Sequence, residues 1–453
     1  MSNKRMRPTV LEASTYDFIS SLPDESLQHI LSFMTTREAI QTCVLSTRWR
    51  HIWKSVQRLK IKASEFTSKM GFVNFMDNLV LHRGCVPLDS LCMNTLYQHG
   101  SVSLNHHNAN TWVGYALRSN VRELHIREHY SEYFDLDHSS FKSSHLKILR
   151  LCYVCISDLF IEKLFSGCPA LQDLVMVDCC VYAIRFSSTS LKNLTFTSHS
   201  PDNGDSVHDD YKDLVIDTPS LVSLHLEYLP FLAPCLVNVS SVAKAYIRLD
   251  DMSFPCFDTK YNILSGLSNV TKLKLLNEEY DDEDEDEDED DSFRSRQNEV
   301  LKRDLWRCQS FNNLKKLSVY DWCVDVDLSA LIYLLRCSPI IEKFTLHLGM
   351  IEGLAWEQWM SYQQEETPDL SFSCERLKKV KIICAQDDKR VPAIVNAILA
   401  NANSLPEIDS FLPPKMRMSN KCVRPTALEA STYDFISSLP DEVLHHMLSF
   451  MTA

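Results

Sequence analysis

The sequence predicts an α/β protein in which an N-terminal domain of three helices precedes an irregular solenoid with a parallel sheet on its concave face. Two patterns favour this fold. Residues 17–56 carry three apolar stripes at helical spacing, and from residue 88 one short apolar phrase recurs, its first six copies starting 20 to 33 residues apart. A length of 453 residues is too great for one ordinary domain and leaves room for both parts.

The composition narrows the class of protein. An apolar content of 45% is typical of a folded chain, and no run of about eighteen apolar residues indicates a membrane span. Met1–Val10 is polar and basic, unlike a secretory signal, so we expect the protein in the cytoplasm, the nucleus or both. Sixteen cysteines in such a chain favour reduced thiols over a disulfide framework.

The net charge of −14 is concentrated in one segment. Glu278–Asp291 holds thirteen acidic residues, and without them the net charge would be −1. We expect this run to be a disordered, solvated insertion in the repeats, because charges of one sign repel each other; an acidic lure for a basic substrate is the alternative. Nothing in the sequence predicts a basic face for nucleic acid.

The first helix of the N-terminal domain is expected to begin near Pro23. Asp24 and Glu25 then lie in its first turn, where the helix dipole favours acidic side chains. Its apolar stripe follows the spacing i, i+3, i+4, i+7 and consists of Leu27, Ile30, Leu31 and Met34. This helix is therefore expected to turn one side towards a core or a partner.

The second and third helices each have their own start signal. Thr35, with Glu38 three residues later, is a capping-box signature for the second helix. Ser46 can cap the third helix, whose stripe consists of Trp49, Ile52, Trp53 and Val56. About forty residues are too few to bury three such stripes alone, so the helices either pack on the rest of the chain or bind a partner protein.

This domain resembles an F-box. The resemblance covers Leu22-Pro23-Asp24-Glu25, the stripe of the first helix, and Val44-Leu45-Ser46-x-x-Trp49-Arg50 followed by Trp53; Ser26 departs from the pattern, which prefers an aliphatic or acidic residue. It implies that residues 17–56 bind a Skp-type adaptor, which docks on the cullin scaffold of a ubiquitin ligase. The positions assigned to the adaptor are Leu22, Pro23, Leu27, Ile30, Leu31, Val44, Leu45, Ser46, Trp49, Arg50 and Trp53.

A linker, residues 57–87, contains an amphipathic helix expected over residues 68–82, and the repeats follow over residues 88–371. Their phrase is apolar-x-x-apolar-x-apolar. Its copies start at Leu88, Val121, Leu146, Leu171, Leu191, Leu221, Val242, Val270, Leu314, Ile341 and Leu377, the last in the C-terminal region. Each copy suits a strand with one face on the core, and stacked units share that core because no unit can bury its face alone. We expect helical or irregular segments between the strands.

The spacing of the phrase is in the leucine-rich-repeat range. Cys168-Pro169-Ala170-Leu171-x-x-Leu174 resembles the repeats of plant F-box/leucine-rich-repeat proteins. Cys155, Cys179 and Cys323 follow the phrase near the point where such repeats place a buried Asn or Cys. Residues 372–411 resemble the C-terminal region called FBD in these proteins, which implies a cap on the open end of the solenoid.

Residues 418–452 repeat residues 1–35, with 29 of 35 positions identical. The identity includes the leader, residues 1–16, which we expect to be flexible and where folding demands little. We therefore expect residues 412–453 to be a linker and the start of a tandem copy, joined by gene fusion or by an error in the gene model. The copy contains no counterpart of Trp49 or Trp53, so a second adaptor site is not expected.

No catalytic motif, cofactor site or metal site is expected. The nine glycines form no phosphate-binding loop, and no nucleophile elbow or zinc-binding helix is present. Cys152-x-x-Cys155 has the spacing of a zinc or redox pair, but it lies within a repeat and no second pair follows at zinc-site spacing. A metal site formed across two repeats with Cys179-Cys180 is a minor alternative.

The expected function is that of a non-catalytic adaptor in which the F-box binds a Skp-type protein and the repeats hold a protein substrate for ubiquitination. Candidates for the substrate face are aromatic, because tryptophans often anchor interfaces, although such residues equally fill the ends and edges of a solenoid. They are Tyr320, Trp322, Trp356 and Trp359. Two alternatives are an F-box scaffold without ligase turnover and a sensor whose repeats bind a small ligand.

Overall fold

The computed structural model describes residues 19, 21–95, 106–128, 134–137, 140–183, 185–197, 214–227, 234–249, 262–277, 292–308, 310–324, 328–349, 374–385, 388–400, 402 and 406–411. These residues divide into two compact units, one ending at Val56 and the other beginning at Gln57. The leader, the acidic run 278–291 and the second copy at 418–452 lie outside the described residues.

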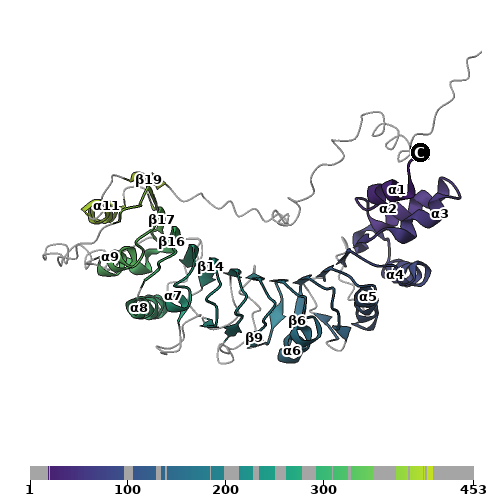
Figure 1. Cartoon of the computed structure of the whole chain (residues 1–453), viewed down its shortest axis with the longest axis horizontal. Helices are drawn as coiled ribbons and strands as arrows, with labels where there is room; N and C mark the ends of the chain where they lie inside the picture. The colour runs from purple at the N-terminus through teal and green to yellow at the C-terminus, as the bar shows by residue number, and fades with distance from the viewer. Residues whose placement is uncertain are drawn as a thin grey trace, which may run out of the picture. The chain divides into compact units, whose positions relative to one another are not determined.

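The first unit is a small helical domain (Figure 1). Its elements are α1 (Asp24–Leu31), α2 (Thr36–Gln41), η1 (Thr42–Val44), α3 (Trp49–Ile52) and η2 (Trp53–Ser55). The apolar stripes meet inside it, and the buried side chains are Leu27, Leu31, Ala39, Trp49, Ile52, Trp53 and Val56. The three helices predicted from the stripes are therefore present, and the two tryptophans are buried within the unit.

Two of the three predicted helix starts are confirmed. Helix α1 begins at Asp24, with Pro23 in the N-cap position. The Thr35 Oγ1 accepts from the Glu38 N–H at 3.4 Å, and the Glu38 Oε2 accepts from the Thr35 N–H at 2.9 Å, which completes the capping box of α2. The prediction that Ser46 caps the third helix is wrong. Helix α3 begins at Trp49 with Arg48 in the N-cap position and no side-chain cap, so Ser46 precedes the cap position by two residues.

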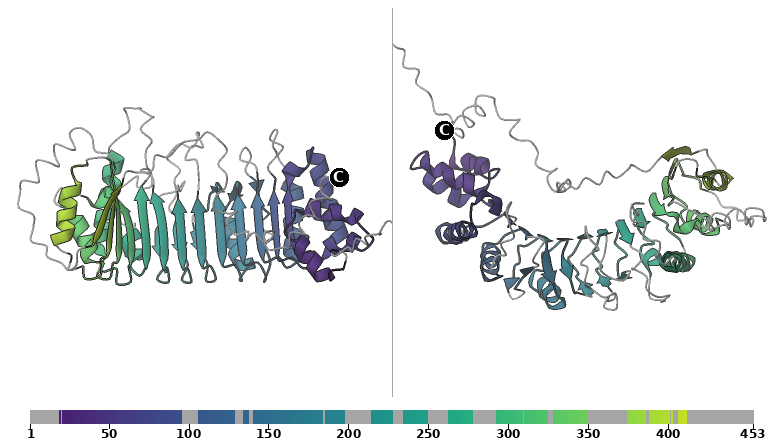
Figure 2. Two further views of the ribbon diagram at one scale, coloured as in Figure 1. Left: turned by 90° about the horizontal axis from the view of Figure 1, so that it is seen from above. Right: turned by 180° about the vertical axis from the view of Figure 1, so that it is seen from behind.

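The second unit is built on one parallel sheet of thirteen strands, which Figure 2 shows side by side. In spatial order the strands are β1 (Arg58–Lys62), β2 (Ser90–Asn94), β3 (Glu123–Arg127), β5 (Ile148–Cys152), β7 (Asp173–Val177), β10 (Asn193–Thr197), β12 (Ser223–Glu227), β14 (Lys244–Leu249), β15 (Lys272–Asn277), β16 (Lys316–Tyr320), β17 (Lys343–His347), β18 (Lys379–Ile383) and β19 (Glu407–Phe411). The solenoid predicted from the phrase is thus present, with its strands in sequence order.

Each of the eleven predicted phrases supplies one of these strands. The second and third apolar positions of the phrase are buried and in register, as in Leu91 opposite Leu124 and Met93 opposite Ile126. Residues between them face the other side of the sheet, since successive strand residues alternate.

Two strands of the thirteen-stranded sheet were not predicted. In β1, Leu59 and Ile61 fit the phrase, but the segment was assigned to the linker. In β19, Ile408 pairs with Val380, but the third position is Ser410, so the apolar pattern is incomplete.

The other side of the array carries helices and two short sheets (Figure 1). The helices are α5 (His106–Arg118), α6 (Asp158–Gly167), α7 (Ile263–Gly266), α8 (Ser292–Arg307), α9 (Ser329–Arg336) and α11 (Val391–Ala400). The short sheets contain β4 (Phe134–Asp135), β6 (Val154–Ile156) and β8 (Cys180–Val181), and β9 (Arg185–Ser187), β11 (Val215–Asp217) and β13 (Cys235–Val237). Several segments predicted as helical or irregular therefore form second strands that pair across repeats.

At the N-terminal end of the sheet, the predicted linker helix is α4 (Lys69–Arg83). Ser68 caps it, because its Oγ accepts from the Gly71 N–H at 3.1 Å. The rings of Phe72 and Trp112 meet edge to face at 5.6 Å, and the Trp112 indole donates to Asp77 at 3.1 Å. Helix α4 is therefore fixed to α5 of the same unit.

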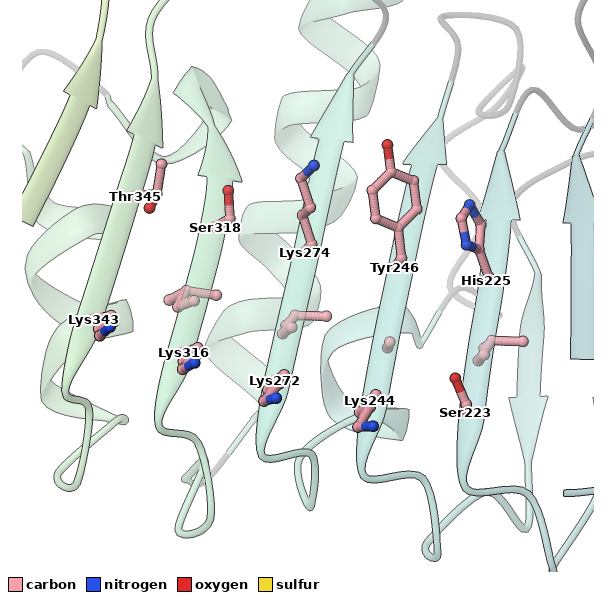
Figure 3. A pocket seen from close by; sticks show the side chains of 14 residues that line it. Ser223, His225, Lys244, Tyr246, Lys272, Lys274, Lys316, Ser318, Lys343 and Thr345 are labelled. Atoms are coloured by element: carbon pink, nitrogen blue, oxygen red, sulfur yellow. The ribbon is translucent and has the colours of Figure 1, made fainter. Parts of the chain in front are cut away.

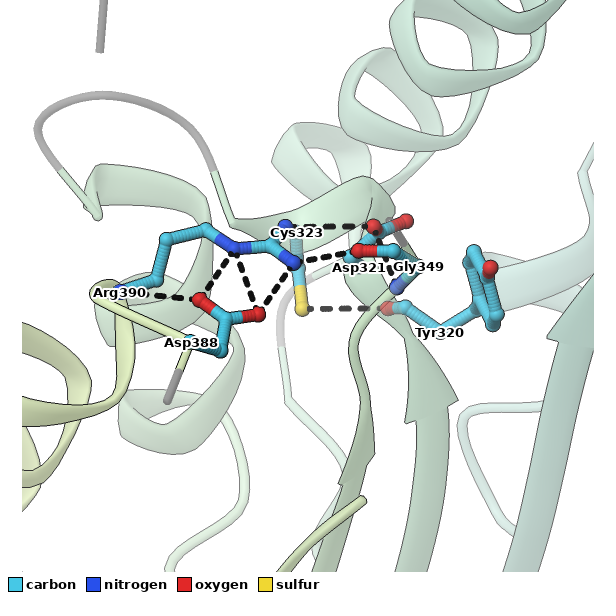
Figure 4. Close-up of polar contacts among 6 residues, drawn as sticks. All are labelled: Tyr320, Asp321, Cys323, Gly349, Asp388 and Arg390. Carbon is cyan, nitrogen blue, oxygen red and sulfur yellow. Dashed lines mark hydrogen bonds and ion pairs between the residues drawn. The ribbon is translucent and has the colours of Figure 1, made fainter. Parts of the chain in front are cut away.

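At the C-terminal end, Arg390 ties the segment before α11 to the ends of β16 and β17 (Figure 4). Its side chain is 3% exposed and pairs with Asp388 at 2.7 Å and with Asp321 at 3.5 Å. Its Nη2 also donates to the Gly349 carbonyl, and the Gly349 N–H donates to Asp321 at 3.0 Å. Three chain segments are therefore joined around one buried guanidinium.

Candidate adaptor and substrate surfaces

Among the described residues of the first unit, the most exposed apolar side chains follow α2. Val44 ends the short helix η1 and is 84% exposed, and Leu45 next to it is 49% exposed. The turn that carries them continues α2 and ends before α3 begins, so neither helix covers them. Two adjacent aliphatic side chains in water are a feature of interaction surfaces when the domain has a complete core of its own.

The structure separates the predicted adaptor residues into groups. Leu27, Leu31, Trp49 and Trp53 are buried in the domain core. Leu22 and Ile30 are partly buried. The exposed members are Pro23, Val44, Leu45, Ser46 and Arg50. The buried group holds the helices together, and the exposed group is what a partner can contact.

Arg48 forms hydrogen bonds between α1 and the residue before α3 that were not predicted from the sequence. Its Nε donates to the Asp24 Oδ1 at 2.8 Å, and its Nη2 donates to the Leu22 carbonyl. The contact joins the residue before α3 to the first turn of α1, across 24 residues of sequence. The sequence shows only an arginine expected to face water, because neither partner lies at helical spacing from it.

On the second unit, one row of lysines crosses the sheet face that is not covered by helices. The first residue of β14, β15, β16, β17 and β18 is lysine, and the five are in register as neighbours. We call Lys244, Lys272, Lys316, Lys343 and Lys379 the lysine row. Because neighbouring strands lie about 4.8 Å apart, the row sets five ammonium-bearing residues at that interval.

Four members of the lysine row, all but Lys379, line a shallow hollow of about 330 Å³ (Figure 3). A second row in the hollow contains His225, Tyr246, Lys274, Ser318 and Thr345. The His225 and Tyr246 rings lie against each other with centroids 4.3 Å apart, and the Lys274 Nζ lies 4.7 Å from the Tyr246 ring centroid. The hollow thus offers cations, hydroxyls and one aromatic pair to a ligand.

The acidic groups near the lysine row are already paired. Glu227 is bound by Arg248 at 3.2 Å, and Lys379 pairs with Asp409 at 2.7 Å and Glu407 at 3.2 Å. The other four lysines of the row are exposed, and none forms an ion pair with a carboxylate in the part of the chain that the structure describes. The face is therefore electropositive across β14 to β17.

Two histidines on the same face of the sheet are held neutral. Burial lowers the pKa of His347 to about 4, and the charges of Lys274, Lys381 and Arg248 act in the same direction. Burial and Arg150 likewise lower the pKa of His125 to about 4. Neither imidazole offsets or adds to the positive charge at neutral pH.

The lysine row was not identified from the sequence, where a basic face was considered only for nucleic acid. Lys244, Lys272, Lys316 and Lys343 are 27 to 44 residues apart in the chain, so no local cluster marks them. The repeats bring them together because the same position of the phrase occupies the same place in every strand. A signal was present: each of the last five phrases reads apolar-x-Lys-apolar-x-apolar.

Comparisons with known proteins agree with both units. The F-box domain family model matches residues 19–61, and the model for the leucine-rich repeats of the FBD-associated F-box protein At5g56370 matches residues 116–243. The chain is similar to the plant F-box/leucine-rich-repeat proteins in both parts. The two matched models end before residue 372, so the FBD-like cap stays a prediction.

Curated relatives of this chain come from Arabidopsis thaliana. The chain is 29% identical to the F-box/LRR-repeat protein At5g35995, 26% to the putative FBD-associated F-box protein At1g78730 and 30% to the F-box/FBD/LRR-repeat protein At5g22700. Each alignment covers 57% of this chain and 63 to 66% of the relative. The chain thus spans less than two thirds of the length of these relatives.

Of the four predicted substrate residues, the structure describes Tyr320 and Trp322. Tyr320 ends β16 and is partly exposed. Trp322 is 3% exposed, so its proposed role as an exposed anchor is wrong: it fills the core of the repeat beside α9. Trp356 and Trp359 lie outside the described residues.

The described cysteines pack within the repeats. Cys179 and Cys323 are buried, as expected for the repeat position, whereas Cys155 is only partly buried. The Cys179 Sγ–H donates to the Leu151 carbonyl at 3.4 Å. Burial raises the pKa of Cys179 to about 12 and that of Cys152 to about 11, so both stay thiols. Among the described residues, no three histidine, cysteine or acidic side chains could hold a metal, and no helix could cross a membrane.

Proposed function

We propose that this protein is the substrate-recognition subunit of an SCF-type ubiquitin ligase, acting in the cytoplasm, the nucleus or both. Its F-box binds a Skp-type adaptor and, through it, a cullin scaffold, while the repeats hold a protein substrate near a ubiquitin-conjugating enzyme. The protein makes and breaks no bonds. It supplies proximity, which raises the local concentration of a target lysine at a remote active site.

The observation that carries the proposal is the pair Val44 and Leu45. The F-box buries both of its tryptophans together with Leu27 and Leu31, yet leaves these two aliphatic side chains in water, 84% and 49% exposed. They belong to the positions that the F-box resemblance assigns to the adaptor. Burying both in a partner would contribute about 3 kcal/mol or more, enough to decide between binding and no binding in a capture experiment.

The test is capture of the full chain by a purified plant Skp-type adaptor. Val44→Asp with Leu45→Asp should weaken capture by about a hundredfold or more, because two charges would enter an apolar contact. The matched control is Leu81→Asp with Leu159→Asp, which alters two apolar side chains, 74% and 45% exposed, on the other unit. If the native chain is not captured, or if both variants lose capture equally, the proposal fails.

Exposed positions make a sharper test than buried ones. Leu31 is 1% exposed and Trp49 is 5% exposed, so their substitution would unfold the F-box and abolish binding for an uninformative reason.

A second measurement separates a ligase subunit from a non-ligase scaffold. A reconstituted ligase should transfer ubiquitin to a partner protein captured by the repeats, whereas a scaffold would leave that partner unmodified.

A further inference from the structure

The lysine row marks a difference between the two halves of the sheet. The first residue of the six strands from β2 to β12 is Ser90, Glu123, Ile148, Asp173, Asn193 and Ser223 in order. None of these is basic, although each occupies the same place in its repeat as a lysine of the row. Solvation of this edge therefore does not require lysine, and its presence in five successive strands calls for another reason.

The row also has an electrostatic cost. Like charges directly opposite each other on neighbouring strands destabilise a sheet, and here four exposed lysines follow one another at about 4.8 Å. At the C-terminal end the arrangement changes, since Lys379 is balanced by Glu407 and Asp409 on β19. The carboxylates that relieve the last lysine show what the other four lack.

We propose that the lysine row binds an acidic, extended segment of the substrate protein. This inference rests on the proposed role of the repeats in holding a protein substrate. The five strands span about 19 Å across the sheet, which an extended chain rising about 3.3 Å per residue crosses in about six residues. Carboxylates of such a segment take the position that Glu407 and Asp409 take beside Lys379, and the hydroxyls of Ser318 and Thr345 lie alongside to accept or donate hydrogen bonds.

The chemistry of the hollow favours a peptide over a nucleic acid. Single-stranded nucleic acids bind through successive aromatic platforms on which bases stack. In the described hollow the aromatic side chains are His225 and Tyr246, which lie against each other, and the remaining lining is lysine, small polar or aliphatic. An acidic peptide needs only cations to bind its carboxylates, and the lysine row supplies them.

The experiment measures binding of a fluorescein-labelled peptide with six consecutive glutamates to the full chain by fluorescence anisotropy. A peptide with glutamines in their place is the ligand control. The test variant carries Lys244→Gln, Lys272→Gln, Lys316→Gln and Lys343→Gln. The matched control carries Lys142→Gln, Lys147→Gln, Lys163→Gln and Lys192→Gln, four exposed lysines outside the strands.

The native chain should bind the glutamate peptide and not the glutamine peptide, and raising the salt from about 0.05 M to about 0.3 M should weaken binding. The test variant should bind about tenfold or more weakly, and the control should change less than about twofold. Equal effects in both variants, or no binding to the native chain, would overturn the proposal. Tighter, row-dependent binding of a single-stranded oligonucleotide would do the same.

A further variant replaces the thirteen acids of 278–291 by serine. Binding of the glutamate peptide only after this replacement would overturn the assignment to a partner, because the chain's own acids would then compete for the row. Capture by the Skp-type adaptor is measured in parallel for every variant. If capture persists while peptide binding fails, the substrate class is wrong and the adaptor function stands; if capture fails in the native chain, the adaptor function is wrong.

Discussion

Replacing Arg390 by methionine should destabilise the C-terminal end of the solenoid. The substitution keeps much of the aliphatic stem but removes the guanidinium, which leaves Asp388, Asp321 and the Gly349 carbonyl without their shared donor. Breaking a buried ion pair from one side costs about 3–5 kcal/mol. Asp321 is 23% exposed and keeps the Gly349 N–H, so we expect a value near the lower end, about 3 kcal/mol.

The assay is amide hydrogen exchange together with urea unfolding. In a solenoid each repeat contacts only its neighbours, so the loss should stay local. Exchange in β18 and α11 should accelerate by about a hundredfold, the factor that corresponds to about 3 kcal/mol, while β2 to β7 should not change. Arg376→Met, at an exposed arginine nearby, is the control. A change no larger than in this control, or equal acceleration throughout the sheet, would refute the reasoning.

The same variant has a pH signature. Burial raises the pKa of Asp388, but the hydrogen bonds and charge of Arg390 outweigh it, so the pKa lies below its ordinary value of 3.8. A carboxyl whose folded pKa is lowered contributes stability above its unfolded pKa and loses it as the pH falls through the folded value. In the Arg390→Met chain burial acts without Arg390 and raises the pKa of Asp388. The stability difference between the native and Arg390→Met chains should therefore be largest at neutral pH, begin to shrink above pH 4 and shrink further below it.

Three further predictions concern stability. Gly167→Ala should cost about 2–4 kcal/mol in urea unfolding, because the new Cβ would strike the Phe141 backbone carbonyl, which cannot rotate away; a neutral result would contradict the packing. The partly buried His125 and His347 should make the fold acid-sensitive between pH 6.5 and about 4, since only the unfolded chain takes up their protons there. His125→Gln with His347→Gln should flatten that slope, by about 1 kcal/mol per histidine after allowance for screening. Trp49→Ala should unfold the F-box, with a loss of about 3–5 kcal/mol seen by tryptophan fluorescence and circular dichroism, and unchanged signals would show that its core is incomplete.

The repeating phrase was enough to predict the solenoid because its apolar positions are set by burial alone. Leu91, Leu124 and Leu149 occupy equivalent places in neighbouring strands and must all be apolar for the units to share a core. Strand β19 was not predicted because the third apolar position of its phrase is occupied by Ser410. It is the last strand of the sheet, where a complete apolar phrase is less strictly required. The short strands on the opposite side were not predicted, because a strand of two or three residues shows too little periodicity in the sequence.

The contacts between distant polar side chains could not be predicted from the sequence, for a different reason. Arg390 finds Gly349 across 41 residues and Arg48 finds Asp24 across 24, and no pattern of spacing encodes either pair. The sequence also does not distinguish the buried members of the F-box motif from the exposed ones, since Leu31 and Val44 are both aliphatic. Only the packing shows that one holds the helices together and the other faces water.

The register of the sheet explains how the basic face survives long insertions. Lys272 and Lys316 are 44 residues apart in sequence, and the interval contains the acidic run 278–291, yet they are paired neighbours on β15 and β16. Loop closure costs little more for a long insertion than for a short one, whereas a one-residue slip of the strand would turn every buried side chain to the surface. The core therefore fixes the place of each lysine whatever the loops contain. The lysines occupy one fixed position of the phrase, so the burial of its apolar positions also fixes where the lysines lie. The loops can therefore change in length without moving these charges.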